Sequence, residues 1–503
     1  MAEHFDVIVV GAGLSGIGAA CHLQHKCPGK SFAILEARDA LGGTWDLFRY
    51  PGIRSDSDMY TLGYAWKPWL GEKAVADGAS ILEYVRETAR ENEVEEKIRF
   101  GHAVKRAAWS TERALWTVEV ERGPNRELVQ FTCGFLHLCA GYYEYAAGYT
   151  PEFAGIDGFE GKVVHPQLWP EDLDYADKRV VVIGSGATAM TLVPSMAKTA
   201  KHVTMLQRSP TYVISRPAKD GVSQALRKVL SPKMAYALVR WKNVFLGMLF
   251  FVLARLFPRP MRRWLLEQVR EEVGPGFDMK HFTPRYSVWD QRVCLVPDGD
   301  LFASIKEGRT SVVTDHIDTF TERGIKLRSG KELDADIVVT ATGLELRVLG
   351  GVEFTVDDRK IELNQTMNYK GCLLSDVPNL ACTFGYTNAS WTLKADLTAD
   401  YVCRLLKHMD AIGARQVVPR RIDPAVKERP FLDFSSGYIQ RALHKFPTQG
   451  SERPWQLYQN YVLDTLLLKY GKLEEPELEF SSPKTARAEG RVPAALEQTT
   501  SPR

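Results

Sequence analysis

The clearest pattern in the sequence is a set of short, continuous apolar runs, each ending in a glycine or a turn. Three of them, 5–10, 179–183 and 336–340, are rich in β-branched residues. Continuous runs of this kind are typical of parallel strands that are covered on both faces. The first two runs are followed by a glycine-rich turn and a helix-like segment, which end near His25 and Ala200. The pattern predicts a doubly wound α/β fold.

Two strand–turn–helix openings indicate two Rossmann-like dinucleotide-binding domains. We expect the second to be inserted in the first, with run 336–340 carrying the chain back to the first domain. The tail lacks periodicity and is rich in Ala, Glu, Pro, Arg and Thr, so we expect it to be disordered. The expected divisions are a first domain in two parts, 1–150 and 336–480, a linker at 151–177, a second domain at 178–335, and the tail at 481–503.

An unusual stretch lies inside the second domain. Residues 216–270 hold twelve Lys or Arg against two acids, and they contain an apolar run at 244–257. Fourteen residues are fewer than the roughly 20 that span a bilayer. We expect a helical insertion at about 216–275 that packs on the domain or lines a substrate entrance. The alternative is a basic, apolar surface that contacts a membrane or a lipophilic substrate.

Composition excludes several classes of protein. The 64 Lys and Arg nearly balance the 62 Asp and Glu, which gives no general case for nucleic-acid binding. The eight cysteines are scattered without a C-x-x-C pair, so neither a zinc ribbon nor a thioredoxin-like motif is expected, and we predict no metal site. We find no signal peptide before the first strand and expect a cytoplasmic enzyme, with peripheral membrane contact through 216–270 as the alternative.

The first glycine-rich turn has the parts of a nucleotide-binding site. Gly11, Gly13 and Gly16 open the helix, Ser15 lies among them, and Glu36 follows the next strand. The glycines allow a tight turn and a close approach by a pyrophosphate at the helix N-terminus. A carboxylate at the ribose position accepts hydrogen bonds from hydroxyl groups and repels a 2′-phosphate. This site therefore predicts FAD or NAD.

The second turn differs at the ribose position. Gly184 and Gly186 open the helix, and Arg208 stands where the first domain has Glu36. A guanidinium suits a 2′-phosphate, so this site predicts NADPH. The neighbouring residues that we assign to NADPH are Ala187, Thr188 and Gln207. Two such sites without a redox cysteine pair indicate a flavoprotein that passes electrons to something other than a disulfide.

Two longer motifs are more specific. Residues 159–170, with Phe159, Gly161, His165 and Trp169 followed by proline, resemble the F-x-G-x-x-x-H-x-x-x-W-P fingerprint of type I Baeyer–Villiger monooxygenases. Residues 42–56 resemble the second signature of that family, and both motifs match at every defined position. The resemblance extends to about residue 470 and is closest to the subgroup of ethionamide-activating monooxygenases.

The resemblance implies a reaction. FAD would be reduced by NADPH and would add O₂ to form a C4a-peroxyflavin, which attacks a ketone and yields an ester or lactone. Relatives also oxidise thioethers, and the apolar insertion favours lipophilic aliphatic or aryl ketones. The sequence identifies neither the particular ketone nor an oligomeric state.

The resemblance also implies roles for single residues. Arg292 matches the active-site arginine, with Arg285 as its rival, and Asp56 matches the acid that positions it. His165 is expected to couple domain motion to cofactor binding, and Trp391 to border the substrate pocket or fill the core. Residues assigned to FAD are Thr44, Trp45, Asp56 and Val104, and Arg54 is assigned to NADPH.

Three rival functions remain at this stage. A flavin monooxygenase acting on nitrogen or sulfur has a similar fingerprint, but it ends in Tyr or Phe where this chain has Trp169. A disulfide reductase needs a cysteine pair beside the flavin, whereas Cys21 and Cys27 lie in the first helix. A non-catalytic membrane-associated protein built on 216–270 would leave both nucleotide sites unexplained.

Overall fold

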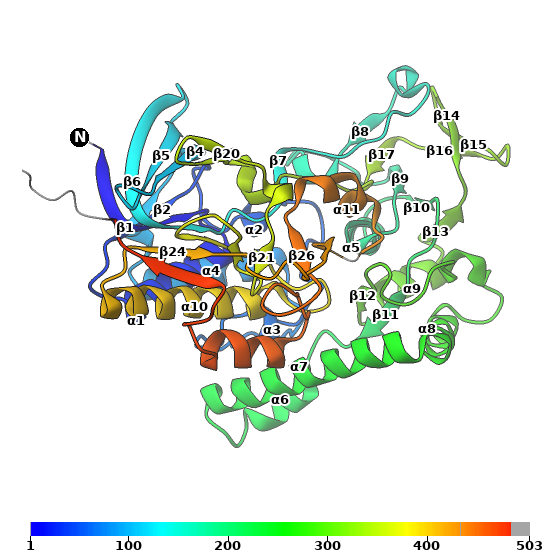
Figure 1. The fold of residues 1–503 in the computed structure, drawn as a ribbon. Helices are drawn as coiled ribbons and strands as arrows, with labels where there is room; N and C mark the ends of the chain where they lie inside the picture. The colour runs from blue at the N-terminus through cyan, green and yellow to red at the C-terminus, as the bar shows by residue number, and fades with distance from the viewer. Residues whose placement is uncertain (1, 433, 484–503) are drawn as a thin grey trace, which may run out of the picture.

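A computed structural model describes residues 2–432 and 434–483, and it shows two α/β units side by side (Figure 1). We call residues 2–148 together with 344–483 the first unit and residues 149–343 the second unit. Each unit is built on its own sheet with a parallel core, and the chain passes between them twice. The structure thus has the α/β class and the two nucleotide-binding units that the sequence predicted.

The first unit contains an eleven-stranded sheet. Its parallel part runs in the order β3-β2-β1-β6, and β23 also pairs with β6 in parallel. These strands are β1 (Glu3–Val10), β2 (Phe32–Leu35), β3 (Ile98–Arg99), β6 (Glu127–Leu138) and β23 (Leu380–Cys382). Helices α1 (Leu14–Lys26) and α10 (Trp391–Ile412) pack together in the core against this sheet.

The remaining strands of this sheet form an antiparallel extension. In it β6 pairs with β5 (Leu115–Arg122), β5 with β4 (His102–Ser110), and β4 with β19 (Glu353–Val356), which pairs with β20 (Arg359–Ile361). One half of β6 therefore belongs to the antiparallel extension, and the other half belongs to the nucleotide-binding sheet.

The second unit has a five-stranded parallel sheet in the order β13-β10-β9-β17-β8. The strands are β8 (Lys162–Val164), β9 (Arg179–Ile183), β10 (His202–Gln207), β13 (Thr310–Thr314) and β17 (Ile337–Thr340). Helices α5 (Ala187–Met196) and α9 (Asp300–Lys306) pack on it through one apolar core. Edge strand β8 comes from the segment that the sequence assigned to a linker.

The expectation that run 336–340 returns the chain to the first unit is wrong. Strand β17 pairs with β9 and β8 inside the second sheet. It follows a small antiparallel sheet of β14 (Ile317–Thr321), β15 (Gly324–Leu327) and β16 (Glu332–Asp334), as β6 follows β4 and β5 in the first unit. Strand β17 is therefore the counterpart of β6, because each pairs in parallel with the strand that precedes the glycine-rich turn of its own unit.

The chain crosses between the units on a two-stranded antiparallel ribbon. Strand β7 (Tyr143–Gly148) leaves the first unit, and β18 (Leu344–Leu346) returns to it. Leu344 pairs with Gly148, and Leu346 pairs with Tyr143. The two connections therefore lie against each other.

The predicted helical insertion is present. It begins and ends at the parallel pair β11 (Val213–Arg216) and β12 (Cys294–Pro297). Between them lie α6 (Gly221–Leu226), α7 (Pro232–Leu256) and α8 (Pro258–Val273), along the lower side of the molecule in Figure 1.

Helix α7 is longer than the apolar run suggested. It has 25 residues, and an 18-residue window reaches a mean hydropathy of 1.6 with only 22% of the window buried. By length and composition it is the one helix in the described part of the chain that could cross a membrane. The 14-residue apolar run that the sequence analysis compared with the span of a bilayer is therefore shorter than the helix that contains most of it.

A buried arginine attaches α7 to the first unit. The Nη1 group of Arg240 donates hydrogen bonds of 2.7 Å to the carbonyls of Tyr60 and Gly63, and Nη2 lies 3.8 Å from Asp396 Oδ2. These partners lie at α3 (Met59–Leu62) and in α10. Removing one member of a buried charge pair leaves the other uncompensated, so this contact fixes α7 on the core.

The predicted disordered tail lies almost wholly outside the described residues, because the structure describes none of 484–503. Its first residue, Ser481, ends strand β27 (Leu478–Ser481), which pairs with β24 (Gln416–Pro419). The end of the described part of the chain is thus joined to the first unit by a regular strand pair.

We expect Arg240→Ala to lower the apparent free energy of unfolding by about 3 kcal/mol, because Asp396 and two backbone carbonyls lose their buried partner. Urea denaturation followed by circular dichroism measures this change. Lys233→Ala, an exposed cation on the same helix, serves as the matched control and should leave stability unchanged. Equal stability of the two variants would contradict the anchoring role.

Candidate active site

A cavity of about 470 Å³ lies where the two units meet. The first unit contributes the turn after β1, the segment 42–57 and the start of β7, and the second unit contributes the start of α5 and Arg292. The predicted site residues that line the cavity are Gly11, Gly13, Ser15, Glu36, Thr44, Trp45, Arg54, Asp56, Val104, Ala187, Thr188, Arg292 and Trp391. Most of the predicted site residues are thus brought together.

The first nucleotide-binding turn has a free helix end. Helix α1 begins after Gly13, and no side chain caps its N-terminal N–H groups. Gly11 has a φ of +99°, and a Cβ there would lie 2.8 Å from the carbonyl oxygen of Cys139. The turn therefore requires glycine, and the exposed N–H groups at a helix N-terminus form a ready site for phosphate.

Glu36 lies beside this helix end. Its Oε2 accepts a 2.7 Å hydrogen bond from the N–H of Ala12, and its Oε1 accepts one of 2.9 Å from the N–H of Arg38. Burial raises the pKa of the Glu36 carboxyl, and these two N–H groups oppose that shift. The carboxylate is thus held in the wall of the cavity, where it can accept hydrogen bonds from the hydroxyl groups of a ribose.

The second turn repeats this arrangement. Helix α5 begins after Gly186, again without a side-chain cap. Gly184 has a φ of +144°, and a Cβ there would lie 2.3 Å from the carbonyl oxygen of Ala341. Strand β17 leads into Ala341 as β6 leads into Cys139, so each turn is closed by the strand next to it.

Gln207 and Arg208, at the end of β10, differ in their surroundings. Arg208 directly follows β10 and is exposed, so its guanidinium is open to an anion. Gln207 is buried, and its Nε2 donates to the carbonyl of His281 at 2.7 Å and to Thr314 Oγ1 at 2.9 Å. Neither Gln207 nor Arg208 lines the cavity, but only the Gln207 side chain is already bound within the described part of the protein. The assignment of Gln207 to NADPH therefore has no support from this geometry.

One ion pair joins the two units inside the cavity. Arg292 Nε lies 2.9 Å from Asp56 Oδ2, and the two side chains keep 39% and 34% of their surface exposed. The Asp56 carboxylate raises the pKa of Arg292 above its ordinary value, so the guanidinium stays charged. Arg285 is exposed and does not line the cavity. The structure thus brings Arg292, and not its rival, to Asp56.

The segment that carries Asp56 packs against the second unit. Phe48 and Tyr50 are buried in the apolar core of that unit. Arg54 Nη1 lies 2.5 Å from Asp300 Oδ2, and Arg54 Nη2 donates to the carbonyl of Met190. The spacing of the second motif therefore has a structural reason, because several of its residues contact the opposite unit.

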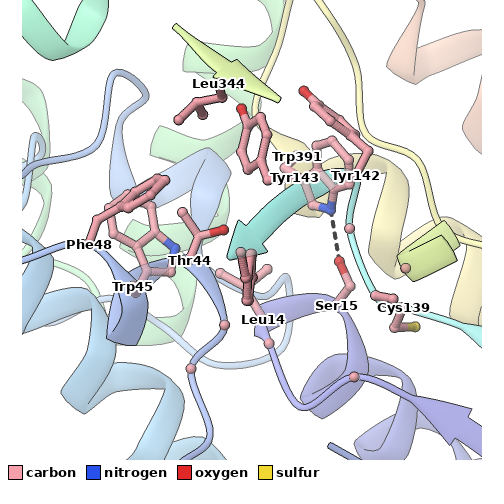
Figure 2. A pocket seen from close by; sticks show the side chains of 18 of the residues that line it. Leu14, Ser15, Thr44, Trp45, Phe48, Cys139, Tyr142, Tyr143, Leu344 and Trp391 are labelled. Atoms are coloured by element: carbon pink, nitrogen blue, oxygen red, sulfur yellow. Dashed lines mark hydrogen bonds between the residues drawn. The ribbon is translucent and has the colours of Figure 1, made fainter. Parts of the chain in front are cut away.

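Sequence reasoning missed a group of tyrosines. Tyr142 and Tyr143 follow β6 and stack edge to face, with ring centroids 4.7 Å apart. They face the cavity together with Trp391, whose Nε1 donates a 2.8 Å hydrogen bond to Ser15 Oγ (Figure 2). Trp45 and Phe48 lie on the other side. Their position in the sequence could have revealed them. Residues 142–145 come just after a parallel strand, and parallel sheets bind ligands beyond the carboxyl ends of their strands.

The tyrosines beside Arg292 are neutral phenols. Burial raises the pKa of both Tyr142 and Tyr143. Tyr50, at the contact with Thr188 of α5, has a pKa raised to about 12 by burial. At neutral pH these phenols are therefore protonated and add no negative charge, so Arg292 keeps a positive field in the cavity.

The first fingerprint lies at the junction between the units and not in the cavity. His165 Nε2 is 3.1 Å from the carbonyl of Gly343, and Nδ1 accepts the N–H of Gln167 at 3.2 Å. Because a carbonyl can only accept, Nε2 carries the proton. Phe159 packs against Phe320, and a Cβ on Gly161 would meet the Phe159 ring. Trp169 contacts Tyr175 beside the core of the second unit.

Other reactive groups are sparse in the described residues. All eight cysteines are free and buried, and Cys139 is the one that lines the cavity. Burial raises the pKa of the Cys139 thiol to about 12, so it is not a thiolate at neutral pH. Within residues 2–432 and 434–483, no cluster of three or more His, Cys, Asp or Glu could hold a metal ion.

Comparisons with known proteins agree with this geometry. The flavin-binding monooxygenase-like family model matches residues 74–432, and an NAD(P)-binding Rossmann-like domain matches residues 9–66. The FAD-containing monooxygenase EthA of Mycobacterium tuberculosis is 54% identical over 483 residues, which cover 96% of this chain and 98% of EthA.

Two solved structures have a similar fold. An oxidised steroid monooxygenase bound to NADP aligns with a TM-score of 0.76 at 22% identity, over 95% of this chain and all of the other. An ε-caprolactone-bound cyclohexanone monooxygenase aligns with a TM-score of 0.75 at 19% identity, again over 95% and 100%. With the family match over most of its length and a close relative along nearly all of it, this protein belongs to the flavin-binding monooxygenase-like family.

Proposed function

We propose that the protein is an FAD-dependent, NADPH-consuming Baeyer–Villiger monooxygenase. The overall reaction takes a ketone, O₂, NADPH and a proton, and gives an ester or lactone, NADP⁺ and water. One oxygen atom of O₂ enters the bond between the carbonyl carbon and a neighbouring carbon, and the other leaves as water. The observation that carries this proposal is the cavity between two nucleotide-binding turns in which Asp56 holds a charged arginine.

The residues present fit the two cofactors. The uncapped start of α1, the Gly11 turn and the buried Glu36 carboxylate suit the pyrophosphate and the free ribose hydroxyls of FAD. The uncapped start of α5 and the exposed Arg208 suit NADPH, since a guanidinium pairs with a 2′-phosphate. EthA is named as FAD-containing, and the similar steroid monooxygenase is bound to NADP.

The flavin, when bound and reduced, supplies the electrons and the activation of O₂. The task of the chain is to orient the substrate and to stabilise negative charge. Arg292 supplies a fixed positive charge that faces the cavity, and a preorganised charge of this kind stabilises an anion that develops in the reaction. Asp56 fixes the guanidinium in place, and the neutral tyrosines beside it do not cancel its charge.

The substrate side of the cavity favours lipophilic compounds. Around Arg292 the walls carry Tyr142, Tyr143, Trp391 and Leu344, which offer apolar surface and aromatic faces. Cavities of this composition bind apolar molecules and exclude water. The proposed substrates are aliphatic or aryl ketones, with thioethers oxidised at the same site. A cytoplasmic location stays a prediction.

The rivals to this function fit the site less well. A disulfide reductase needs two cysteines beside the flavin, and Cys139 alone lines the cavity, as a protonated thiol. An enzyme restricted to nitrogen and sulfur would match the fold and both nucleotide sites. The complete fingerprint ending at Trp169-Pro170 favours the ketone-oxidising branch, and product analysis separates the two.

We expect Arg208→Ala to lower kcat/KM for NADPH by about 10- to 100-fold and to leave that for NADH nearly unchanged. The reason is the loss of charged hydrogen bonds worth about 1.5–3 kcal/mol. Steady-state oxidation of both coenzymes measures the change. Lys326→Ala removes an exposed cation on β15 of the same unit and is the control. Equal use of NADPH and NADH by the wild-type enzyme would contradict the assignment of Arg208.

We expect wild-type enzyme to convert aliphatic, cyclic or aryl ketones to esters or lactones, and Arg292→Ala to lower ester formation by at least about 100-fold. Reduction of the bound flavin by NADPH should persist in the variant. Chromatographic quantification of the oxygenated product measures this, because loss of NADPH also occurs without oxygenation.

Arg285→Ala is the matched control for this experiment, because Arg285 is exposed outside the cavity. It should form ester at the wild-type rate. Ester formation by Arg292→Ala at that rate would contradict the role of Arg292. Wild-type products from thioethers or amines alone would favour the nitrogen- and sulfur-oxidising function.

A further inference from the structure

The helical insertion carries most of the exposed apolar surface of the described chain. Thirteen of the 22 large apolar side chains that are exposed lie between residues 222 and 264. We call their surface the α6–α8 surface. It comprises Val222, Val229, Met234, Leu238, Trp241, Phe245, Leu246, Leu249, Val252, Leu253, Leu256, Phe257 and Trp264. Soluble monomers rarely expose so extended an apolar patch without a partner.

On α7 these side chains form one stripe. Met234, Leu238, Trp241, Phe245 and Leu249 follow each other at spacings of four, three, four and four residues, and Val252 and Leu256 continue the series. The buried residues of α7, which include Ala235, Val239 and Val244, fall between them on the other side. Among the residues that the structure describes, the exposed apolar face of α7 therefore has no partner.

The charges that α7 and its flanking segments carry along this stripe are positive. No acidic residue occurs between Asp220 and Glu267. Exposed cations stand before or at the start of α7, at Lys228 and Lys233, and at its end and in α8, at Arg255, Arg259 and Arg263. Of these, Arg255 lies 3.3 Å from Asp290. An apolar stripe about 33 Å long is thus bordered by positive charge at both ends.

This charge pattern decides between a second copy of the chain and an anionic lipid surface. A symmetric dimer across the centre of α7 would place the cations near Lys233 against those near Arg259 of the other copy, where like charges repel. Anionic headgroups attract both ends at once, while the stripe enters the acyl boundary. Trp241 and Trp264 are of the residue type that is enriched at this boundary.

The helix is suited to lie on a bilayer and not to cross it. Its inner face holds the buried Arg240, which is bound to the carbonyls of Tyr60 and Gly63. Crossing a bilayer would require breaking these contacts and placing the guanidinium in hydrocarbon. The arginine therefore keeps one face of α7 on the first unit and leaves the opposite face for the lipid.

The same helix forms part of the structure behind the cavity. Val244 and Met248, on its inner side, pack against Tyr386 and Ala389, which line the cavity. Phe250 and Phe251 contact Trp289, three residues before Arg292. One helix thus separates the α6–α8 surface from the wall of the active site.

We propose that the α6–α8 surface docks the enzyme on an anionic lipid bilayer, with α7 lying in the membrane interface. The apolar stripe supplies the buried contact, and the cations at its two ends supply the attraction to the headgroups. This interaction goes beyond the proposed oxidation of ketones, and its test does not depend on that activity.

The experiment is cosedimentation of the flavin-loaded enzyme with sucrose-loaded vesicles. Vesicles of phosphatidylcholine mixed with phosphatidylglycerol should sediment the wild-type enzyme, whereas phosphatidylcholine alone should bind at least about tenfold less. Binding to the anionic vesicles should weaken as salt is raised, because salt screens exposed charges.

Two variants separate the two contributions. Phe245→Ser/Leu249→Ser removes part of the stripe, and Arg259→Glu/Arg263→Glu reverses two cations; each should lower binding by at least about tenfold. The control Leu128→Ser/Ile422→Ser removes two exposed apolar side chains of the first unit and should bind as wild type does. All three change exposed residues, and circular dichroism verifies their fold.

Wild-type binding by either α6–α8 variant would overturn the proposal, as would equal binding to the neutral and anionic vesicles. Light scattering supplies the remaining outcome. If the wild-type enzyme were a dimer that Phe245→Ser/Leu249→Ser converts to a monomer, and neither bound vesicles, the stripe would be an interface between copies of the chain and the proposal would be wrong.

Discussion

The ion pair between Asp56 and Arg292 is the interaction on which the site depends, because its two members come from different units. A guanidinium is useful as a fixed charge only if it cannot rotate into solvent, and Asp56 provides that restraint. The pair therefore links the relative position of the units to the electrostatics of the cavity. Movement of one unit against the other would change the site that the two nucleotide-binding turns share.

Several features of the fold serve to keep that relative position. Phe48 and Tyr50 of the first unit are buried in the core of the second, and Arg54 pairs with Asp300. The ribbon of β7 and β18 carries both crossings, and His165 hydrogen-bonds to Gly343 beside it. These contacts explain why the two longer motifs of the sequence lie at the junction, where a hinge between nucleotide-binding units would act.

Helix α7 combines two requirements that rarely occur together. One of its faces is fixed on the core by Arg240 and packs behind the cavity, and the other carries unpartnered apolar side chains. The first requirement explains the buried polar residues in an otherwise apolar helix. The second has no explanation within residues 2–432 and 434–483, where these side chains stay exposed.

The resemblance to a known family pointed to Asp56 and Arg292, whereas the sequence by itself determined the two glycine turns and the contrast between Glu36 and Arg208. Local geometry sets these features. A turn at positive φ requires Gly11, and the residue that faces the ribose stands at a fixed place, directly after the next strand of its unit.

The tertiary structure alone decided which sheet takes β17, that Gln207 faces inward, and that Tyr142 and Tyr143 form a wall of the cavity. It also decided which face of α7 is buried. Each of these depends on pairing and packing between segments far apart in the chain. A short strand such as β17, with three buried aliphatic residues and a buried threonine, fits either parallel sheet, so its own composition cannot select one.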